Sequence, residues 1–169
     1  MYISEMKTDK MPRIDATDKR ISDLLLEDGR MSCSQIARRI GGDLSERAVR
    51  YRINRLIKSG VISVRGNVNA EAIGLPVCAD VFIEVEPSLI DTIAKQIAEY
   101  ESVSYIAYST GDNDISIQLF TRNNSEMFRF VTEVIGKIPG VRKTHISFVP
   151  IKIKDDHVWP IPSSIVTKD

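Results

Sequence analysis

The chain has 169 residues, enough for one ordinary domain or two small ones, and 43% of them are hydrophobic. No apolar run approaches the ~20 residues of a membrane span, and the first residues lack the apolar stretch of a secretory signal. We therefore expect a cytoplasmic protein rather than a membrane or secreted one. The 23 basic and 23 acidic residues cancel, which taken alone argues against a nucleic-acid partner.

The distribution of charge along the chain changes that conclusion. Residues 1–70 contain 14 Lys and Arg against 9 Asp and Glu, a net charge of +5, whereas residues 71–169 contain 9 against 14, a net charge of −5. A basic half joined to an acidic half is typical of a protein in which only one domain touches a polyanion.

The N-terminal half predicts three short helices. Residues 1–13 are expected to form a flexible arm, and residues 14–70 a winged helix-turn-helix domain. Asp15, Ser32 and Ser45 each precede an amphipathic run and can accept a hydrogen bond from the first turn of a helix. The third helix is expected to end near Ser59, and a tight glycine-containing turn before it completes the helix-turn-helix pattern.

A β-hairpin wing is expected after the third helix. Val61–Val64 is a short β-prone run, and Gly66-Asn67 offers the positive φ angles that a tight hairpin turn requires. Residues 71–76 then read as a linker.

The C-terminal half predicts an alternating series of strands and helices. The expected elements are, in chain order, Val77–Val85, Ser88–Glu101, Val103–Ser109, Ile115–Thr121, Ser125–Lys137 and Val141–Val149. The second helix is predicted to be amphipathic, with Phe128, Val131 and Ile135 on its apolar face. The order β-α-β-β-α-β is that of a ferredoxin-like module, here residues 77–150, so the predicted fold class is α+β. One face of such a sheet is left bare, and a second copy of the chain is a natural cover for it. Residues 151–169 form a C-terminal tail.

The third helix separates its residues into two arcs. An arc facing the other two helices is predicted to hold Val49, Ile53, Leu56 and Ile57. The opposite arc is rich in cations, with Glu46 as the one acidic residue of the helix, whereas an ordinary solvated face would interleave acidic residues. We expect double-stranded DNA as the partner: Arg47, Arg50, Tyr51 and Asn54 would read bases, and Ser45, Arg55 and Lys58 would hold the backbone.

At this point the chain resembles the Lrp/AsnC family of bacterial and archaeal regulators. The stretches that carry the resemblance run from Ile14 to Val141 and include Asp28-Gly-Arg-Met-Ser32, Gln35-Ile-Ala-Arg-Arg-Ile40, Leu44-Ser-Glu-Arg-Ala-Val49, Arg52-Ile-Asn-Arg-Leu56, Ile73-Gly-Leu75, Thr110-Gly-Asp-Asn-Asp114 and Pro139-Gly-Val141. The resemblance implies a homo-oligomer, either a dimer or a larger assembly such as a ring of four dimers, and an amino-acid effector. The effector would bind at Gly111, Asp112, Asn113 and Asp114, a loop that equally fits an ordinary hairpin turn.

Three features depart from the family pattern. The turn Gly41–Leu44 is about two residues longer than usual, which affects the angle between the last two helices. Ile146 stands where the family often has a threonine, which bears on effector selectivity. The tail exceeds the common family length and is open to two interpretations, a frayed end or a strap across a neighbouring subunit anchored by Trp159.

Other functions find less support in the sequence. An enzyme like the siroheme decarboxylases, which resemble the same family, would be histidine-rich, and the chain has only His145 and His157. Neither histidine has a catalytic neighbour in sequence, so no catalytic residue is predicted. Cys33 and Cys78 lie in different predicted domains without metal-ligand spacing, so no metal or cofactor is expected. A further alternative is a ligand-binding oligomeric module with little direct effect on DNA.

Overall fold

The computed structural model describes residues 12–154 and 158–167, which fall into two compact units. The first unit contains the described residues up to Asn67 together with those from Lys154 onward, and the second spans Val68–Ile153. The chain therefore passes between the units twice, once in each direction. No helix within the described ranges is long and apolar enough to span a membrane.

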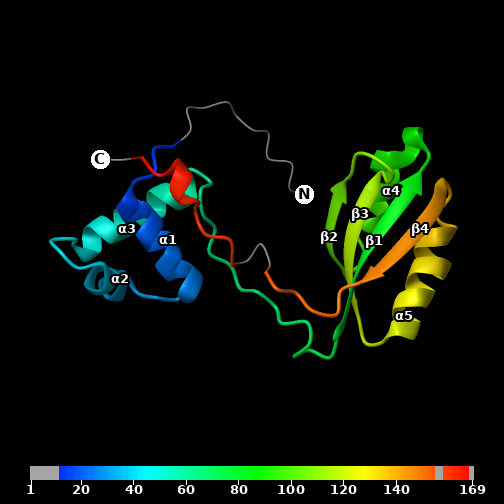
Figure 1. Cartoon of the computed structure of the whole chain (residues 1–169), viewed down its shortest axis with the longest axis horizontal. Coiled ribbons are helices and arrows are strands. Elements are labelled where there is room, and N and C mark those ends of the chain that lie inside the picture. The colour runs from blue at the N-terminus through cyan, green and yellow to red at the C-terminus, as the bar shows by residue number, and fades with distance from the viewer. Residues whose placement is uncertain (1–11, 155–157, 168–169) are drawn as a thin grey trace. The chain divides into compact units, whose positions relative to one another are not determined.

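The first unit contains three helices, α1 (Ala16–Glu27), α2 (Cys33–Ile40) and α3 (Glu46–Lys58) (Figure 1). The three predicted caps are confirmed, since each capping side chain accepts a hydrogen bond from a backbone N–H of its helix; the caps are Asp15, Ser32 and Ser45. The buried cluster that joins the helices consists of Ile21, Leu24, Ile36 and Val49. Leu56 is also buried, but Ile57, predicted to face this core, is 45% exposed. Adjacent helical residues point about 100° apart, so a narrow three-helix core holds only one of the two.

The turn between α2 and α3 depends on two glycines. Gly41 and Gly42 both have positive φ, at 79° and 65°, a region that residues with a Cβ rarely adopt. The β-hairpin predicted for the wing does not form, because residues 61–69 contain no paired strand. The φ of Gly66 is not positive, so the expected two-residue hairpin turn does not form, and Val61–Val64 is too short to hold a ladder without one.

The second unit is an antiparallel four-stranded sheet with the strand order β2-β3-β1-β4. Its strands are β1 (Val77–Val85), β2 (Val103–Tyr108), β3 (Ile115–Thr121) and β4 (Val141–Phe148). This order is the one that a β-α-β-β-α-β ferredoxin-like module requires, and it confirms the predicted α+β class. The strand register places Val81 opposite Ile117 and Ile146, so their side chains share one face of the sheet.

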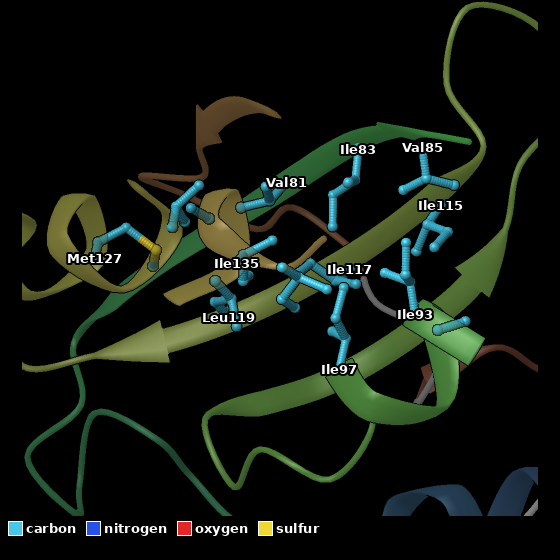
Figure 2. Packing of buried hydrophobic residues seen from close by; sticks show 14 residues of the cluster. Val81, Ile83, Val85, Ile93, Ile97, Ile115, Ile117, Leu119, Met127 and Ile135 are labelled. Carbon is cyan, nitrogen blue, oxygen red and sulfur yellow. The ribbon is translucent and has the colours of Figure 1, made fainter. Parts of the chain in front are cut away.

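That face carries the core of the unit (Figure 2). Alternate residues of β1 and β3 are buried with side chains from the helices that cover the sheet; they include Val81, Ile83, Val85, Ile93, Ile97, Ile115, Ile117, Leu119, Met127 and Ile135. No helix of the described residues covers the opposite face, which presents a mixed surface. Phe82 lies beside His145 there, and the Gln118 side chain donates a 2.9 Å hydrogen bond to Asp80.

The helices of this unit differ from the prediction in length and phase. The first is α4 (Ile90–Ile97), shorter than predicted and preceded by a 3₁₀ turn at Pro87–Leu89. The second begins as α5 (Asn124–Arg129) and continues as a π-helical turn, Phe130–Val134, and a 3₁₀ turn, Ile135–Lys137.

The π-helical turn explains a wrong prediction about the core. Phe128 was expected to face the sheet but is 63% exposed, whereas Met127 is fully buried. A π turn has more residues per turn than an α-helix, so it favours the four-residue spacing of Met127, Val131 and Ile135. The exposed Phe128 lies in a shallow groove on the outer side of α5.

Candidate nucleic-acid interface and effector loop

The predicted DNA-reading side chains share one exposed surface of α3. Arg47, Arg50, Tyr51, Asn54 and Lys58 are all exposed, and Tyr51 reaches 69%. Within the described part of the chain, four of these five have no hydrogen-bond or ion-pair partner; the exception is Arg50, whose Nη2 lies 2.5 Å from Oε1 of Glu46. That pair is solvated and one helical turn apart, so DNA phosphates can displace it at small cost.

The other two predicted residues already have structural partners. The Ser45 hydroxyl accepts a hydrogen bond from the Ala48 N–H as the cap of α3, which leaves its own hydrogen available for a phosphate oxygen. Arg55 is 39% exposed and forms an ion pair with Asp18 of α1. Its positive charge is thus partly neutralised before any DNA arrives.

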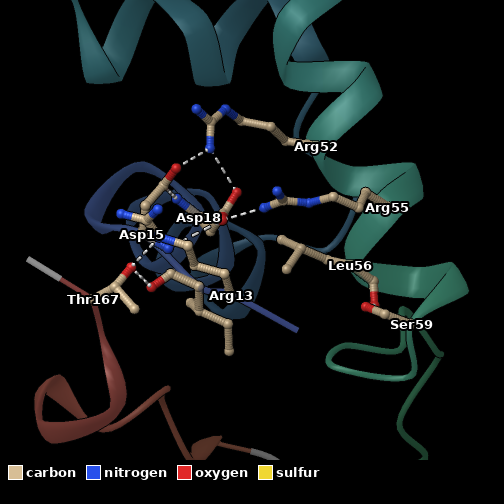
Figure 3. Close-up of polar contacts among 9 residues, drawn as sticks. Arg13, Asp15, Asp18, Arg52, Arg55, Leu56, Ser59 and Thr167 are labelled. Carbon is tan, nitrogen blue, oxygen red and sulfur yellow. Dashed lines mark hydrogen bonds and ion pairs between the residues drawn. The ribbon is translucent and has the colours of Figure 1, made fainter. Parts of the chain in front are cut away.

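A partly buried ionic cluster joins α1 to α3, as Figure 3 shows. Asp18 is fully buried and accepts hydrogen bonds from Arg52 at 2.8 Å and from Arg55. Arg52 also donates to Asp15, the cap of α1, at 2.6 Å. Burial would raise the pKa of Asp15, but hydrogen bonds from Arg52 and the Asp18 N–H, with the charge of Arg52, hold it below its ordinary value. The cluster fixes the helix that carries the reading surface.

The reasoning from sequence missed this cluster, although a signal for it was present. Asp18 falls three residues before Ile21 and so lies on the apolar side of α1. A carboxylate on an apolar face requires a cationic partner. Arg52 lies between the predicted apolar and cationic arcs of α3, so it was a candidate for that cationic partner.

The predicted effector loop connects β2 to β3. Gly111 has a φ of 116°, which fits a glycine-dependent turn. Asp114 is tied into the sheet, because its Oδ2 accepts a 2.8 Å hydrogen bond from the Val85 N–H and its own N–H donates to Ile83. Asp112 is exposed, Asn113 is half-buried, and neither has a partner within the described ranges. The two carboxylates of the loop are therefore in different situations, because Asp114 is bonded to the sheet through one oxygen and Asp112 is not.

The remaining residues singled out from the sequence have ordinary environments. His145 is an exposed strand residue, and His157 lies outside the described residues. Ile146 is half-buried against the core of the sheet. Both cysteines have free thiols, and burial raises the pKa of Cys78. Residues 12–154 and 158–167 hold no group of three or more side chains suited to a metal ion.

The C-terminal tail returns to the first unit. The Thr167 N–H donates a 2.9 Å hydrogen bond to the Ile14 carbonyl, and its hydroxyl donates to the same oxygen at 3.0 Å. Arg13 Nε donates to the Thr167 hydroxyl at 3.2 Å (Figure 3). Trp159, a predicted anchor, is 66% exposed. The end of the described tail is thus hydrogen-bonded to its own chain through Thr167, and a strap across a neighbouring subunit through Trp159 stays a prediction.

Comparison with known families matches both units. Residues 14–63 match the model of a winged helix-turn-helix DNA-binding domain, and residues 78–159 match that of the Lrp/AsnC ligand binding domain. An uncharacterised HTH-type transcriptional regulator of Pyrococcus abyssi is 37% identical over 81% of this chain and 86% of its own length. The HTH-type transcriptional regulator FL11 of the same organism is 34% identical over 88% of this chain and 97% of its own length.

Solved structures share the fold over most of the chain. Escherichia coli AsnC superposes with a TM-score of 0.76 at 19% identity, covering 85% of this chain and 97% of that one. A transcriptional regulator of Neisseria meningitidis, determined as a complex with L-methionine, superposes with a TM-score of 0.79 at 23% identity, covering 87% and 96%.

Proposed function

The chain belongs to the Lrp/AsnC family of DNA-binding transcriptional regulators, and from this premise we propose that it is a cytoplasmic, sequence-specific regulator whose assembly responds to a small effector. It acts by binding rather than by catalysis. The observation that carries the proposal is the exposed, cationic surface of α3, which is held in place by the Asp18 cluster.

The side chains of this surface divide by chemistry into two roles. Arg47 and Arg50 can donate two hydrogen bonds to a guanine edge, and Asn54 can pair with adenine in the same way. Tyr51 lies among them and contacts bases through its ring or hydroxyl. Ser45 and Lys58 suit phosphate oxygens, which supply affinity without sequence information. Arg55 would join them at the backbone only by sharing its charge with Asp18.

The uncovered face of the sheet supports a dimer. Phe82 and Phe120 are half-buried on this face, and covering them with a second copy removes apolar surface from water. A two-fold dimer would carry two copies of α3, whose half-sites are spaced by about one turn of DNA or a multiple of it. The operator is then expected to be pseudo-palindromic, and further assembly into a ring of four dimers follows the family pattern.

An amino acid is the proposed effector class. The chain contains the family's ligand-binding module, and one structural neighbour was solved with L-methionine. In this chain the exposed Asp112 carboxylate can accept hydrogen bonds from an α-ammonium group, and Gly111 lets a ligand approach the backbone closely. Such a ligand changes the assembly only if it binds one oligomer more tightly than another.

Fluorescence anisotropy with the DNA upstream of its own gene tests the proposal. The measurement is made at two salt concentrations against random DNA of equal length, with and without a pool of amino acids. Binding that prefers the upstream DNA and weakens steeply with salt is expected, because neutralised phosphates release counterions. A shift on adding the pool supports the effector role.

The alternative is an oligomeric ligand-binding module without direct regulation of DNA. It predicts a shallow salt dependence and no preference for any DNA, while oligomer size still changes with the amino-acid pool. The anisotropy titrations separate the two functions, and sedimentation velocity on the same samples measures the change in oligomer size that both predict.

A further inference from the structure

The end of the described chain is built into the DNA-binding unit. Thr167 makes three hydrogen bonds around Ile14, two of them to the Ile14 carbonyl oxygen. Ile161, Pro162 and Val166 are half-buried, and Ile14 itself is 8% exposed. A peptide that only frayed in solvent would not satisfy backbone groups in this way.

The contact between Thr167 and Ile14 lies next to the ionic cluster that joins α1 to α3. Ile14 immediately precedes Asp15, the residue that caps α1 and accepts the 2.6 Å hydrogen bond from Arg52 of α3. Figure 3 shows Asp15 lying between Thr167 and Arg52 in this region. Fixing the backbone of Ile14 restricts the φ and ψ angles that aim the Asp15 carboxylate.

The beginning of the same tail is fixed to the sheet. The Val149 N–H donates to the Cys78 carbonyl at 2.9 Å. Lys152 donates to the Gln118 side chain at 2.8 Å, and its ammonium lies 5.2 Å from the centre of the Phe120 ring. The tail is thus bonded to the second unit at one end and to the first unit at the other.

We propose that the segment 161–167 is a positioning element for DNA reading: by holding Ile14 it fixes Asp15, and through Arg52 it fixes α3. The tail also connects the sheet covalently to the DNA-binding unit, as residues 71–76 do. If α3 is held in one orientation before DNA binds, the entropic cost of binding is lower. This inference rests on the proposed function, since it assigns the tail a part in DNA binding.

Three variants of the full chain test the proposal. Removing residues 161–169 deletes the contact, and because the deleted segment contains one lysine and one aspartate, the net side-chain charge is unchanged. Thr167→Val keeps the shape of the side chain but loses its hydroxyl bonds to Arg13 and Ile14. Ser164→Ala is the matched control, because this exposed side chain makes no hydrogen bond in the described structure.

Hydrogen exchange of the free protein is measured together with DNA affinity. In the wild type, the amide of Thr167 and the first turn of α1 are expected to be protected. The truncation should speed exchange in α1 and lower affinity for specific DNA by about tenfold, with an unchanged salt slope, and Thr167→Val should give a smaller loss. Ser164→Ala should match the wild type.

The outcomes separate this proposal from the function on which it rests. Exchange at Thr167 as fast as in an unfolded peptide overturns the docking, whatever happens with DNA. Faster exchange in α1 with no loss of DNA affinity overturns the positioning role and leaves the regulator function intact. A wild type that prefers no DNA defeats the proposed function and the positioning role together, while the exchange data still decide the docking.

Discussion

The buried carboxylate of Asp18 in α1 accepts a 2.8 Å hydrogen bond from Nη1 of Arg52 in α3, so an ion pair joins the two helices. Arg55, one turn further along α3, binds the other oxygen of the same carboxylate. An aliphatic contact would tolerate rotation of α3 about its axis, whereas two directed ionic bonds define one orientation. The surface opposite Arg52 is the one that carries Arg47, Arg50 and Asn54.

Asp18→Asn should destabilise the first unit. The amide keeps the shape but leaves Arg55 without a counter-charge and Arg52 with Asp15 alone in a partly desolvated site, at a cost of about 2–3 kcal/mol in the free energy of unfolding. Urea unfolding of the full chain, followed by circular dichroism, measures it. Asp43→Asn is the control, because Asp43 is exposed and has no partner among the described residues. Equal stability of the two variants would contradict the structural role of Asp18.

Asp15 gives the first unit a defined response to acid. Its pKa is lowered in the folded protein, because the hydrogen bond from Arg52 and those from backbone amides outweigh the opposing effect of burial. The ionised form is therefore favoured by folding, and its contribution is present above the unfolded pKa of about 3.9 and lost as pH falls through the folded pKa.

The test compares wild type with Asp15→Asn, which keeps a good helix cap but removes the charge. The wild type should be more stable by about 1 kcal/mol at neutral pH, and this difference should shrink below about pH 4. Urea unfolding at pH 7, 5, 4 and 3 provides the comparison. A difference that stays constant across these values would show that the charge of Asp15 is not involved.

The sequence was sufficient for features that depend on local chemistry. The caps Asp15, Ser32 and Ser45 were predicted because a short polar side chain before an amphipathic run has one favourable use. The strands β1 and β3 were predicted to the residue, since alternating apolar residues such as Val81 and Ile83 fit one buried face. The exposed positions on α3 followed from the 3.6-residue period of a helix.

What failed depended on tertiary contacts. Phe128 was placed in the core because the pattern assumed a regular α-helix, and a π turn changed the phase. The wing was predicted from Gly66-Asn67, but turn residues do not form a hairpin without strands that pair. The bond between Thr167 and Ile14 joins residues 153 positions apart, a separation at which no local pattern gives a signal.

Arg47→Ala and Lys58→Ala should weaken DNA binding in different ways. Loss of a base-reading arginine should reduce the preference for specific over random DNA by about 10- to 100-fold. Loss of a phosphate-binding lysine should weaken both DNAs alike and reduce the salt slope by about one. Anisotropy titrations on both DNAs distinguish these results. A uniform loss for Arg47→Ala would remove its base-reading role.

Asp112→Ala and Asp114→Ala should separate ligand binding from stability within one loop. Asp114 accepts the Val85 N–H, so its removal leaves a backbone donor unpaired and should cost about 1–2 kcal/mol of unfolding free energy. Asp112 has no such bond, so its removal should leave stability unchanged and abolish the response of DNA binding to amino acids. If Asp112→Ala responds like the wild type, the effector binds elsewhere.

Phe82→Glu should dissociate the proposed dimer. Phe82 lies on the uncovered sheet face beside His145, and a carboxylate there would have to lose its water on dimerisation. The dissociation constant is expected to rise by about 100-fold or more, measured by sedimentation velocity. Phe128→Glu is the matched control, because it makes the same change on the outer side of α5. If Phe128→Glu gives monomers and Phe82→Glu does not, the dimer forms through the helical layer, and the two α3 helices are spaced differently from the proposal.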